Sequence, residues 1–164
     1  MFEKGRRFRR FDECFWDADT PAFGYVPADA DSMLGKFGEI VNCKPLTGEP
    51  VLMALLGPPY AQHVEGSLSD EEVVDEFLSV ARRLADLTPG WGRKKALPAV
   101  AATLVTRWEA DPYARGSYSF LPVGAAPTDR ASLAAPIEDT CFWCGEATHL
   151  RYPVSPHRMT IGQW

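Results

Sequence analysis

The segment that most constrains the fold runs from Asp70 to about Leu87 and has the pattern of a long amphipathic helix. Ser69 can cap its start, and Glu72, three residues later, completes a capping box. Apolar residues then recur at three- and four-residue spacing, which places them on one face: Val73, Val74, Phe77, Leu78, Ala81, Leu84 and Ala85. The Thr-Pro-Gly sequence at 88–90 ends the pattern. The sequence therefore predicts a helix that buries one stripe against a second layer.

The second layer is predicted to be a sheet, because short apolar runs lie on both sides of the helix. The runs that are typical of strands cover residues 11–16, 23–26, 37–43, 51–56, 100–108 and 140–144. Pro and Gly at residues 45–50 favour a turn, so the third and fourth runs are expected to form a hairpin. We expect Trp108 and Phe142 to be buried in a core that the last two strands share. Residues 121–136 are expected to cross the surface as a long loop. The predicted fold class is α+β, a mixed sheet with one long helix.

The charge of the chain argues against direct binding to nucleic acid. The 164 residues carry a formal net charge of -5, whereas domains that bind nucleic acid usually present a basic surface. A basic cluster near Met1 is the exception, formed by Lys4, Arg6, Arg7, Arg9 and Arg10. We interpret this cluster as a solvated tail, with a nucleic-acid or targeting patch as the alternative.

The sequence shows neither an apolar segment of membrane-spanning length nor a signal peptide, so an intracellular protein is expected. The four cysteines, Cys14, Cys43, Cys141 and Cys144, are then expected to be reduced thiols. Cys141-x-x-Cys144-x-x-x-x-His149, with His157 beyond it, offers an alternative as zinc ligands. Both cysteines of this motif fall in an apolar run, where a free Cys behaves as a small hydrophobe. We therefore expect no metal site.

Two motifs in the last third of the sequence carry the functional information. The first is T-R-W-E-A-D-P-Y-A-R-G-S-Y-S at residues 106–119. The second is F-W-C-G-E-A-T-H at residues 142–149, followed by Y-P-V-S-P-H at residues 152–157. Together they resemble the C-terminal signature of the flavin-dependent amine oxidases, in particular the branch of polyamine oxidases and lysine-specific histone demethylases.

The resemblance runs roughly from Phe11 to His157 and covers only the C-terminal part of a family member. It implies one partial domain over residues 1–164, in which residues 11–120 are part of the substrate domain and residues 137–157 contact FAD. No G-x-G-x-x-G turn, which would hold the FAD pyrophosphate, occurs in the sequence. The N-terminal Rossmann half is therefore expected to be absent, and the chain to be a C-terminal fragment.

The resemblance also implies roles for individual residues. Trp108 would lie beside the isoalloxazine ring, and Tyr118 would form part of the aromatic enclosure around the substrate amine, so both are candidate catalytic residues. The residues implied to contact FAD are Trp108, Gly145, Glu146 and Ser155, with Glu146 at the ribityl and pyrophosphate region. Glycine at position 145 would let the backbone approach the cofactor closely.

Each of these residues also has a simpler interpretation. Trp108 taken alone is typical of a core aromatic residue, and Tyr118 and Phe120, as alternate residues, can simply pack. Within the first motif the functional interpretation is favoured for Trp108 and Tyr118. Arg107 and Asp111 are expected to be structural, forming a pair or capping the turn at Pro112.

The implied activity is the FAD-dependent oxidation of an amine, either a polyamine or a methylated lysine, with hydride transfer to the flavin and production of hydrogen peroxide. Pro156 departs from the family pattern, because the family offers a backbone N–H to the flavin at this position and proline has none. The catalytic lysine of the family lies upstream of the matched residues, and Lys36 and Lys44 are expected at the surface. This chain alone is therefore expected neither to retain FAD nor to oxidise amines. The alternative function is a catalytically inactive fragment that serves as a protein-interaction module.

Overall fold

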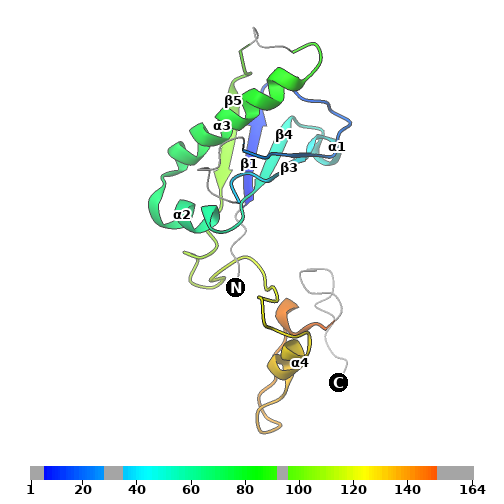
Figure 1. Ribbon diagram of the computed structural model, residues 1–164, viewed down its shortest axis with the longest axis vertical. Helices are drawn as coiled ribbons and strands as arrows, with labels where there is room; N and C mark the ends of the chain where they lie inside the picture. Colours follow the sequence, from blue (N-terminus) through cyan, green and yellow to red (C-terminus); the bar gives the residue numbers. More distant parts are fainter. Residues whose placement is uncertain (1–5, 28–34, 92–95, 151–164) are drawn as a thin grey trace. The chain divides into compact units, whose positions relative to one another are not determined.

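Five antiparallel strands form one sheet in the order β2-β3-β4-β1-β5 (Figure 1). The strands are β1 (Arg6–Phe11), β2 (Ala22–Gly24), β3 (Glu39–Asn42), β4 (Val51–Leu55) and β5 (Val100–Val105). The predicted α+β class is confirmed. The prediction of a mixed sheet is wrong, because every strand pair among the described residues is antiparallel.

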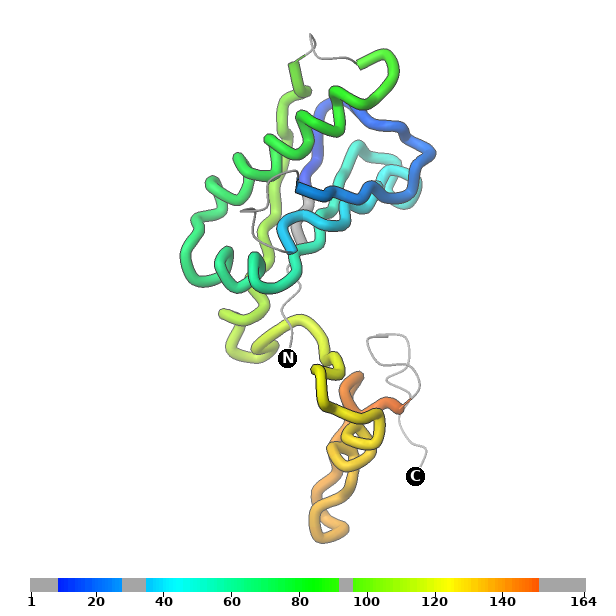
Figure 2. Tube along the Cα trace, viewed as in Figure 1, coloured from blue at the N-terminus to red at the C-terminus, as the bar shows by residue number. Residues whose placement is uncertain are grey.

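The computed structural model describes residues 6–27, 35–91 and 96–150. The chain divides into two units, one of Glu3–Arg115 and one of Gly116–Trp164 with Met1–Phe2. The first unit contains the sheet and three helices, and Figure 2 shows its chain passing through the helices and returning to the sheet at β5. The second unit contains α4 (Thr128–Ala134) and a short 3-10 helix, η1 (Glu146–Thr148).

The predicted hairpin is confirmed by the pairing of β3 with β4, in which Ile40 lies opposite Ala54. Its connection is more than a turn, because it contains the short helix α1 (Lys44–Thr47). Gly48 ends α1 with φ of 76°, a left-handed conformation that glycine adopts without steric cost. The strand predicted at residues 23–26 is shorter than expected, since β2 ends at Gly24.

The long helix α3 (Asp70–Leu87) has the predicted boundaries and the predicted capping box. The Ser69 hydroxyl accepts a hydrogen bond of 3.2 Å from the Glu72 backbone N–H, and the Glu72 carboxylate accepts one of 2.8 Å from the Ser69 backbone N–H. A shorter helix that the sequence pattern did not predict, α2 (Tyr60–Ser67), precedes α3. No helix in the described part of the chain is long and apolar enough to cross a bilayer.

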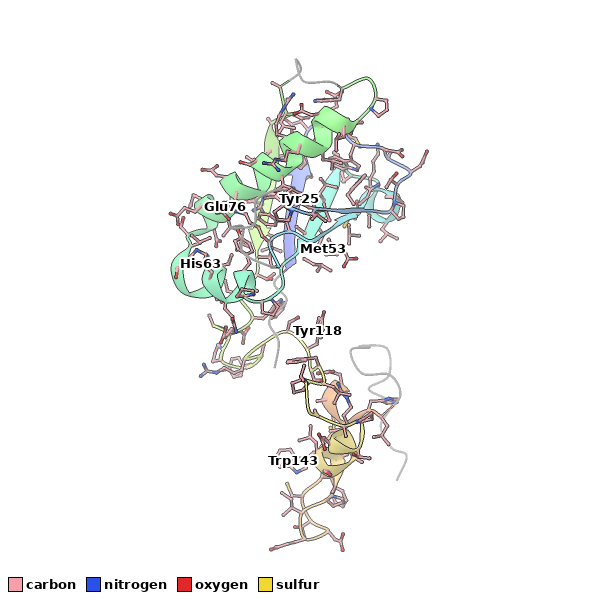
Figure 3. All side chains as sticks on the ribbon, viewed as in Figure 1. Tyr25, Met53, His63, Glu76, Tyr118 and Trp143 are labelled. Atoms are coloured by element: carbon pink, nitrogen blue, oxygen red, sulfur yellow. The ribbon has the colours of Figure 1, made fainter. Side chains whose placement is uncertain are left out.

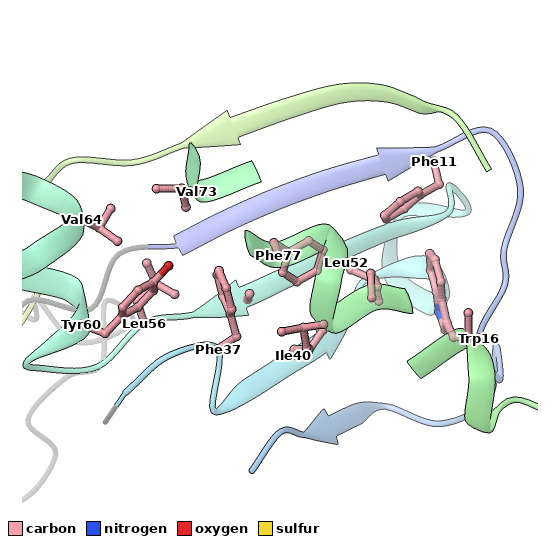
Figure 4. Close-up of a cluster of buried hydrophobic side chains, with 14 of the residues drawn as sticks. Phe11, Trp16, Phe37, Ile40, Leu52, Leu56, Tyr60, Val64, Val73 and Phe77 are labelled. Carbon is pink, nitrogen blue, oxygen red and sulfur yellow. The ribbon is translucent and has the colours of Figure 1, made fainter. Parts of the chain in front are cut away.

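One face of the sheet packs against α2 and α3 around a single apolar core (Figure 4). In β4, Leu52 and Ala54 are fully buried while their neighbours are half-buried, as expected for a strand with one covered face. Phe77 of α3 is fully buried, and its ring lies 5.4 Å from that of Phe37. The buried residues of α3 are Val73, Phe77, Val80, Ala81 and Ala85. Val80 was not on the predicted stripe, and the predicted positions Val74, Leu78 and Leu84 are only half-buried.

The interpretation of the basic cluster as a solvated tail is wrong in two respects, because Arg6–Phe11 form the strand β1 and Arg9 is buried, whereas Arg10 is exposed as expected. This strand pairs with β4 on one side and with β5 on the other. Arg9 is fully buried, and its guanidinium lies 5.6 Å from the centre of the Phe77 ring. A buried arginine is tolerated here because the ring face attracts the cation and the aliphatic stem packs as an apolar group.

The predicted strand at residues 11–16 is also wrong, since β1 ends at Phe11 and the chain leaves the sheet. The aromatic side chains of this run still enter the core, with the rings of Phe11 and Phe15 4.9 Å apart. The Trp16 indole N–H donates a 3.0 Å hydrogen bond to the buried Asn42 side chain. Apolar content therefore indicated burial correctly, but it did not indicate strand structure.

The second unit differs most from the prediction. Residues 140–144 do not form a strand; an isolated bridge joins Ile137 to Cys141 instead. Phe142 is 49% exposed rather than buried. Residues 121–136 are not a plain loop, because they contain α4. The predicted strand at residues 140–144 is therefore wrong, and the one predicted at residues 100–108 ends at Val105.

Candidate functional site

The first motif begins where β5 ends, and Arg107 fixes this point to the two helices that precede it. The Arg107 guanidinium donates to the backbone carbonyls of Val64 at 2.6 Å and Leu68 at 2.7 Å. It also forms an ion pair with Asp70, at 2.7 Å. Arg107 is therefore structural, as expected, and it sets the position from which Trp108 projects.

Asp111 caps the turn that follows Trp108. Its carboxylate accepts hydrogen bonds from the backbone N–H groups of Tyr113 at 2.8 Å and Ala114 at 3.1 Å. The predicted role of Asp111 at the Pro112 turn is confirmed. Trp108 itself is 37% exposed, so the expectation of a buried Trp108 is wrong. An indole outside the core remains accessible to a group that packs on it.

Glu146 of the second motif binds Ser119 of the first motif through both carboxylate oxygens. Oε1 accepts a hydrogen bond of 2.7 Å from the Ser119 backbone N–H, and Oε2 accepts one of 2.9 Å from the Ser119 hydroxyl. The two residues lie in the same unit. In the second unit, the Glu146 carboxylate thus joins the end of the first motif to the second motif.

Arg130 of α4 completes this arrangement, and the sequence pattern did not identify it as a site residue. Its Nη1 donates to the Ser119 hydroxyl at 2.8 Å and to the Ala147 carbonyl at 2.9 Å, and the residue is only 6% exposed. Arg130, Ser119 and Ala147 also line an open hollow of about 280 Å³. The available signal was weak: a Thr-Asp-Arg-Ala-Ser-Leu-Ala run between Pro127 and Pro136, which has the composition of a short helix.

Gly145 precedes Glu146 in a conformation that favours glycine. Its φ is 151°, outside the range of ordinary side-chain-bearing residues, and a Cβ added there would meet no atom within 4 Å. The backbone at this position is therefore open on the side where a Cβ would stand. An open glycine next to a carboxylate acceptor fits the hydroxyl-bearing chain of a flavin dinucleotide. The residues present are thus compatible with FAD.

The remaining predicted site residues are distributed as follows. Tyr118 is half-buried and lies outside the five strands, next to Ser119 in the second unit, and it is labelled in Figure 3. Trp108 belongs to the other unit. Ser155, with Pro156 and His157, lies outside the described residues.

The lysines that were expected at the surface, Lys36 and Lys44, are both half-buried, so that expectation is wrong. Lys36 lies 3.1 Å from the Glu76 carboxylate, which also accepts a hydrogen bond from the Tyr60 hydroxyl. The Lys36 ammonium lies 5.3 Å from the centre of the Tyr60 ring. These contacts join the segment before β3 to α2 and α3, which gives Lys36 a structural role.

The four cysteines are free thiols. Cys43 is buried, and burial raises the pKa of its thiol. Cys141 and Cys144 are exposed, in contrast to the apolar environment expected for them. Among the residues that the structure describes, no cluster of three or more His, Cys, Asp or Glu side chains is arranged to hold a metal ion.

Comparison with known proteins agrees with the resemblance of the motifs. Residues 8–161 match the family model for flavin containing amine oxidoreductase. The chain is 34% identical over 157 residues to "Possible lysine-specific histone demethylase 1" of Drosophila melanogaster and 34% identical over 157 residues to "Histone demethylase-like protein A" of Aspergillus fumigatus. It is 33% identical over 148 residues to "Lysine-specific histone demethylase 1 homolog 2" of Oryza sativa subsp. japonica.

Each of these alignments covers 90% of the chain, but only 16%, 14% and 18% of the respective relative. The similarity therefore extends over nearly all of this sequence and over a small segment of each relative. The chain belongs to the flavin-containing amine oxidoreductase family, in the branch that resembles the lysine-specific histone demethylases.

Proposed function

We propose that this chain is the part of an FAD-dependent amine oxidase that provides one portion of the substrate domain, residues 11–120, and the C-terminal FAD-contacting segment, residues 137–157. The observation that carries the proposal is the pairing of Glu146 with Ser119, because it joins the last residues of the first motif to the second motif. The proposed FAD contacts are made by Trp108, Gly145, Glu146 and Ser155.

A bound FAD would supply the acceptor for a hydride from the carbon next to the amine nitrogen. As that hydride leaves, positive charge develops on the substrate, and the ring of Tyr118 is proposed to stabilise it. The flat indole of Trp108 is proposed to exclude water from the flavin. Glu146 is proposed to hold the ribityl hydroxyls as an acceptor, and its two hydrogen bonds from Ser119 fix the direction of its carboxylate.

The proposed substrate is a methylated lysine in a peptide, with polyamine as the alternative. The names of the similar proteins support methyl-lysine, since the relatives from Drosophila melanogaster and Oryza sativa are both named lysine-specific histone demethylases. The amine reacts in its neutral form, so positive charge appears on it only as the hydride leaves and the iminium forms, and aromatic rings attract such a cation.

The decisive experiment is to sequence the transcript upstream of Met1 and to express the protein that it encodes. An in-frame glycine-rich Rossmann turn, bound flavin detected by its visible absorbance, and hydrogen peroxide formation with a dimethyl-lysine peptide are expected. Spermine and the unmethylated peptide are the matched controls for substrate class. A folded protein without flavin and without peroxide formation would overturn the proposal and favour the protein-interaction module.

A further inference from the structure

We propose that Arg130, acting through Ser119, is a positioning residue that sets the Glu146 carboxylate for the cofactor. This inference deepens the proposed function and rests on it, since Glu146 is the proposed FAD contact. The family signature motifs do not include Arg130, which lies between them on α4.

Two consecutive hydrogen bonds lead from Arg130 through Ser119 to Glu146, each donated toward the carboxylate. Arg130 Nη1 donates to the Ser119 hydroxyl at 2.8 Å, and the same hydroxyl donates to Glu146 Oε2 at 2.9 Å. A hydroxyl that accepts from a cation becomes a stronger donor, because the two bonds polarise each other. Arg130 therefore strengthens the bond that orients Glu146 without touching the carboxylate itself in these contacts.

Arg130 also holds the backbone of the segment that bears Glu146. The same Nη1 donates to the carbonyl of Ala147, the residue after Glu146 in η1, at 2.9 Å. Side chain and main chain of the proposed cofactor contact are thus fixed by one guanidinium. A lysine ammonium also carries several donors on one nitrogen, but it is a compact, strongly hydrated charge on a flexible stem, so it should reproduce this arrangement only in part.

The burial of Arg130 makes its positive charge costly unless nearby groups compensate for it. Arg130 is 6% exposed, and a buried cation is costly unless acceptors and a counter-charge stand near it. The acceptors described above, the Ser119 hydroxyl and the Ala147 carbonyl, are neutral, and the Glu146 carboxylate lies one hydrogen bond beyond Ser119. The Glu146 carboxylate therefore provides the counter-charge for the buried Arg130 guanidinium, and the Ser119 hydroxyl connects the two groups.

The test uses the complete protein encoded by the transcript, in four forms besides the wild type: Arg130→Gln, Arg130→Lys, Ser119→Ala and the control Ser132→Ala. Ser132 is an exposed α4 residue whose hydroxyl bonds only the Thr128 carbonyl, at 3.4 Å, in the described contacts. The dissociation constant of FAD is measured by quenching of its fluorescence. Turnover at saturating FAD and the KM for the amine are measured in parallel.

Arg130→Gln and Ser119→Ala are expected to raise the FAD dissociation constant roughly tenfold or more, as expected when a hydrogen bond to a charged group is lost. Arg130→Lys should recover part of the affinity, and Ser132→Ala should leave it unchanged. Neither Arg130→Gln nor Ser119→Ala replaces a residue that is proposed to contact the amine, so turnover at saturating FAD and the amine KM should change much less than the FAD affinity does. This split separates positioning of the cofactor contact from a general loss of structure.

Equal FAD affinity of the wild type, Arg130→Gln and Ser119→Ala would overturn the inference while leaving the proposed function intact. Loss of turnover at saturating FAD in parallel with affinity would also overturn it, because it indicates damage to the whole site. If Arg130→Gln does not fold, Ser119→Ala decides, since it removes only a hydroxyl. A wild-type protein that binds no FAD would overturn both the proposed function and the inference.

Discussion

Arg107 forms an ion pair with Asp70 at 2.7 Å, and this contact joins the residue before Trp108 to the first turn of α3. The same guanidinium also binds the carbonyls of Val64 and Leu68, near the end of α2. The end of β5 is therefore attached to both helices that cover the sheet. The hydrogen bonds of Arg107 to the two backbone carbonyls are less exposed to solvent than the ion pair, since the Asp70 side chain is 54% exposed.

Removal of the two partners should therefore have unequal effects. Arg107→Ala is expected to lower the free energy of unfolding by about 2 to 3 kcal/mol, because it leaves two carbonyls without this donor. Asp70→Ala should cost less than about 1 kcal/mol, as is usual for exposed ion pairs. Urea denaturation of the 164-residue chain measures both. Equal losses would show that the ion pair, and not the carbonyl bonds, provides the stability.

The capping box of α3 and its buried face give a second prediction. Ser69→Ala should cost about 1 kcal/mol through the lost cap. Phe77→Ala should cost about 3 to 5 kcal/mol, because Phe77 is fully buried against Phe37 and Arg9. Ser79→Ala is the control, since the exposed Ser79 hydroxyl bonds only within its own helix in the described contacts. The ranking can be read from denaturation midpoints, and a Ser69→Ala loss as large as that of Phe77→Ala would contradict it.

Stability should fall in acid partly through Glu72. Hydrogen bonds from the Ser69 backbone and side chain, with a smaller contribution from His63, lower the pKa of the Glu72 carboxyl from its ordinary value of 4.5. A lowered pKa in the folded state stabilises the protein above pH 4.5, and this contribution is lost as the pH falls through the folded-state value. Glu72→Gln, which can still complete the capping box, should have a shallower loss of stability in acid than the wild type. Parallel stability curves below pH 5 would count against this role.

In the complete protein, Tyr118 and Glu146 should affect different steps. Tyr118→Ala is expected to lower turnover about two- to thirtyfold, the range of a cation–π contribution of about 0.5 to 2 kcal/mol. Tyr118→Phe keeps the ring and should stay close to the wild type. Glu146→Ala should mainly weaken FAD retention. Steady-state kinetics with a dimethyl-lysine peptide and FAD titration separate the two effects, and unchanged turnover in Tyr118→Ala would exclude the proposed enclosure role.

The 164-residue chain expressed by itself is expected not to retain FAD. Its sequence contains no glycine-rich pyrophosphate turn, so the contacts of Trp108, Gly145 and Glu146 must offset the whole ordering cost of a large flexible cofactor. The purified chain should show no flavin absorbance, no saturable quenching of FAD fluorescence and no peroxide with spermine or a methyl-lysine peptide. Stoichiometric flavin in the purified chain would be the contrary result.

The parts of the fold that could be predicted from sequence are those whose signals are local. The start, buried face and end of α3 are all encoded within residues 69–90, and the hairpin of β3 and β4 is encoded by two apolar runs and the Pro and Gly between them. The first and second motifs could likewise be read directly, because their residue order is specific. Local signals of this kind need no knowledge of the distant chain.

The features that sequence did not reveal depend on contacts between distant residues. Arg9 looks like part of a solvated tail until β4 and β5 enclose it. The apolar run at residues 140–144 resembles a strand, but no neighbouring strand pairs with it in the described unit beyond one bridge. Arg130 acquires its role only through Ser119 and Ala147, 11 and 17 residues away. Residue type and spacing do not show which distant residues will contact one another in the folded chain.

The position of β1 has a consequence for how the chain is made. Phe8 of this strand pairs with Leu104 of β5, so one side of β1 stays without its final neighbour until synthesis of the chain has passed Leu104, 96 residues later. Pairing across such a long loop is slow, because closure entropy must be overcome before the contacts form. A nascent or arrested chain that stops before Leu104 therefore carries an open strand edge, which is the feature that recruits other unfinished chains into aggregates.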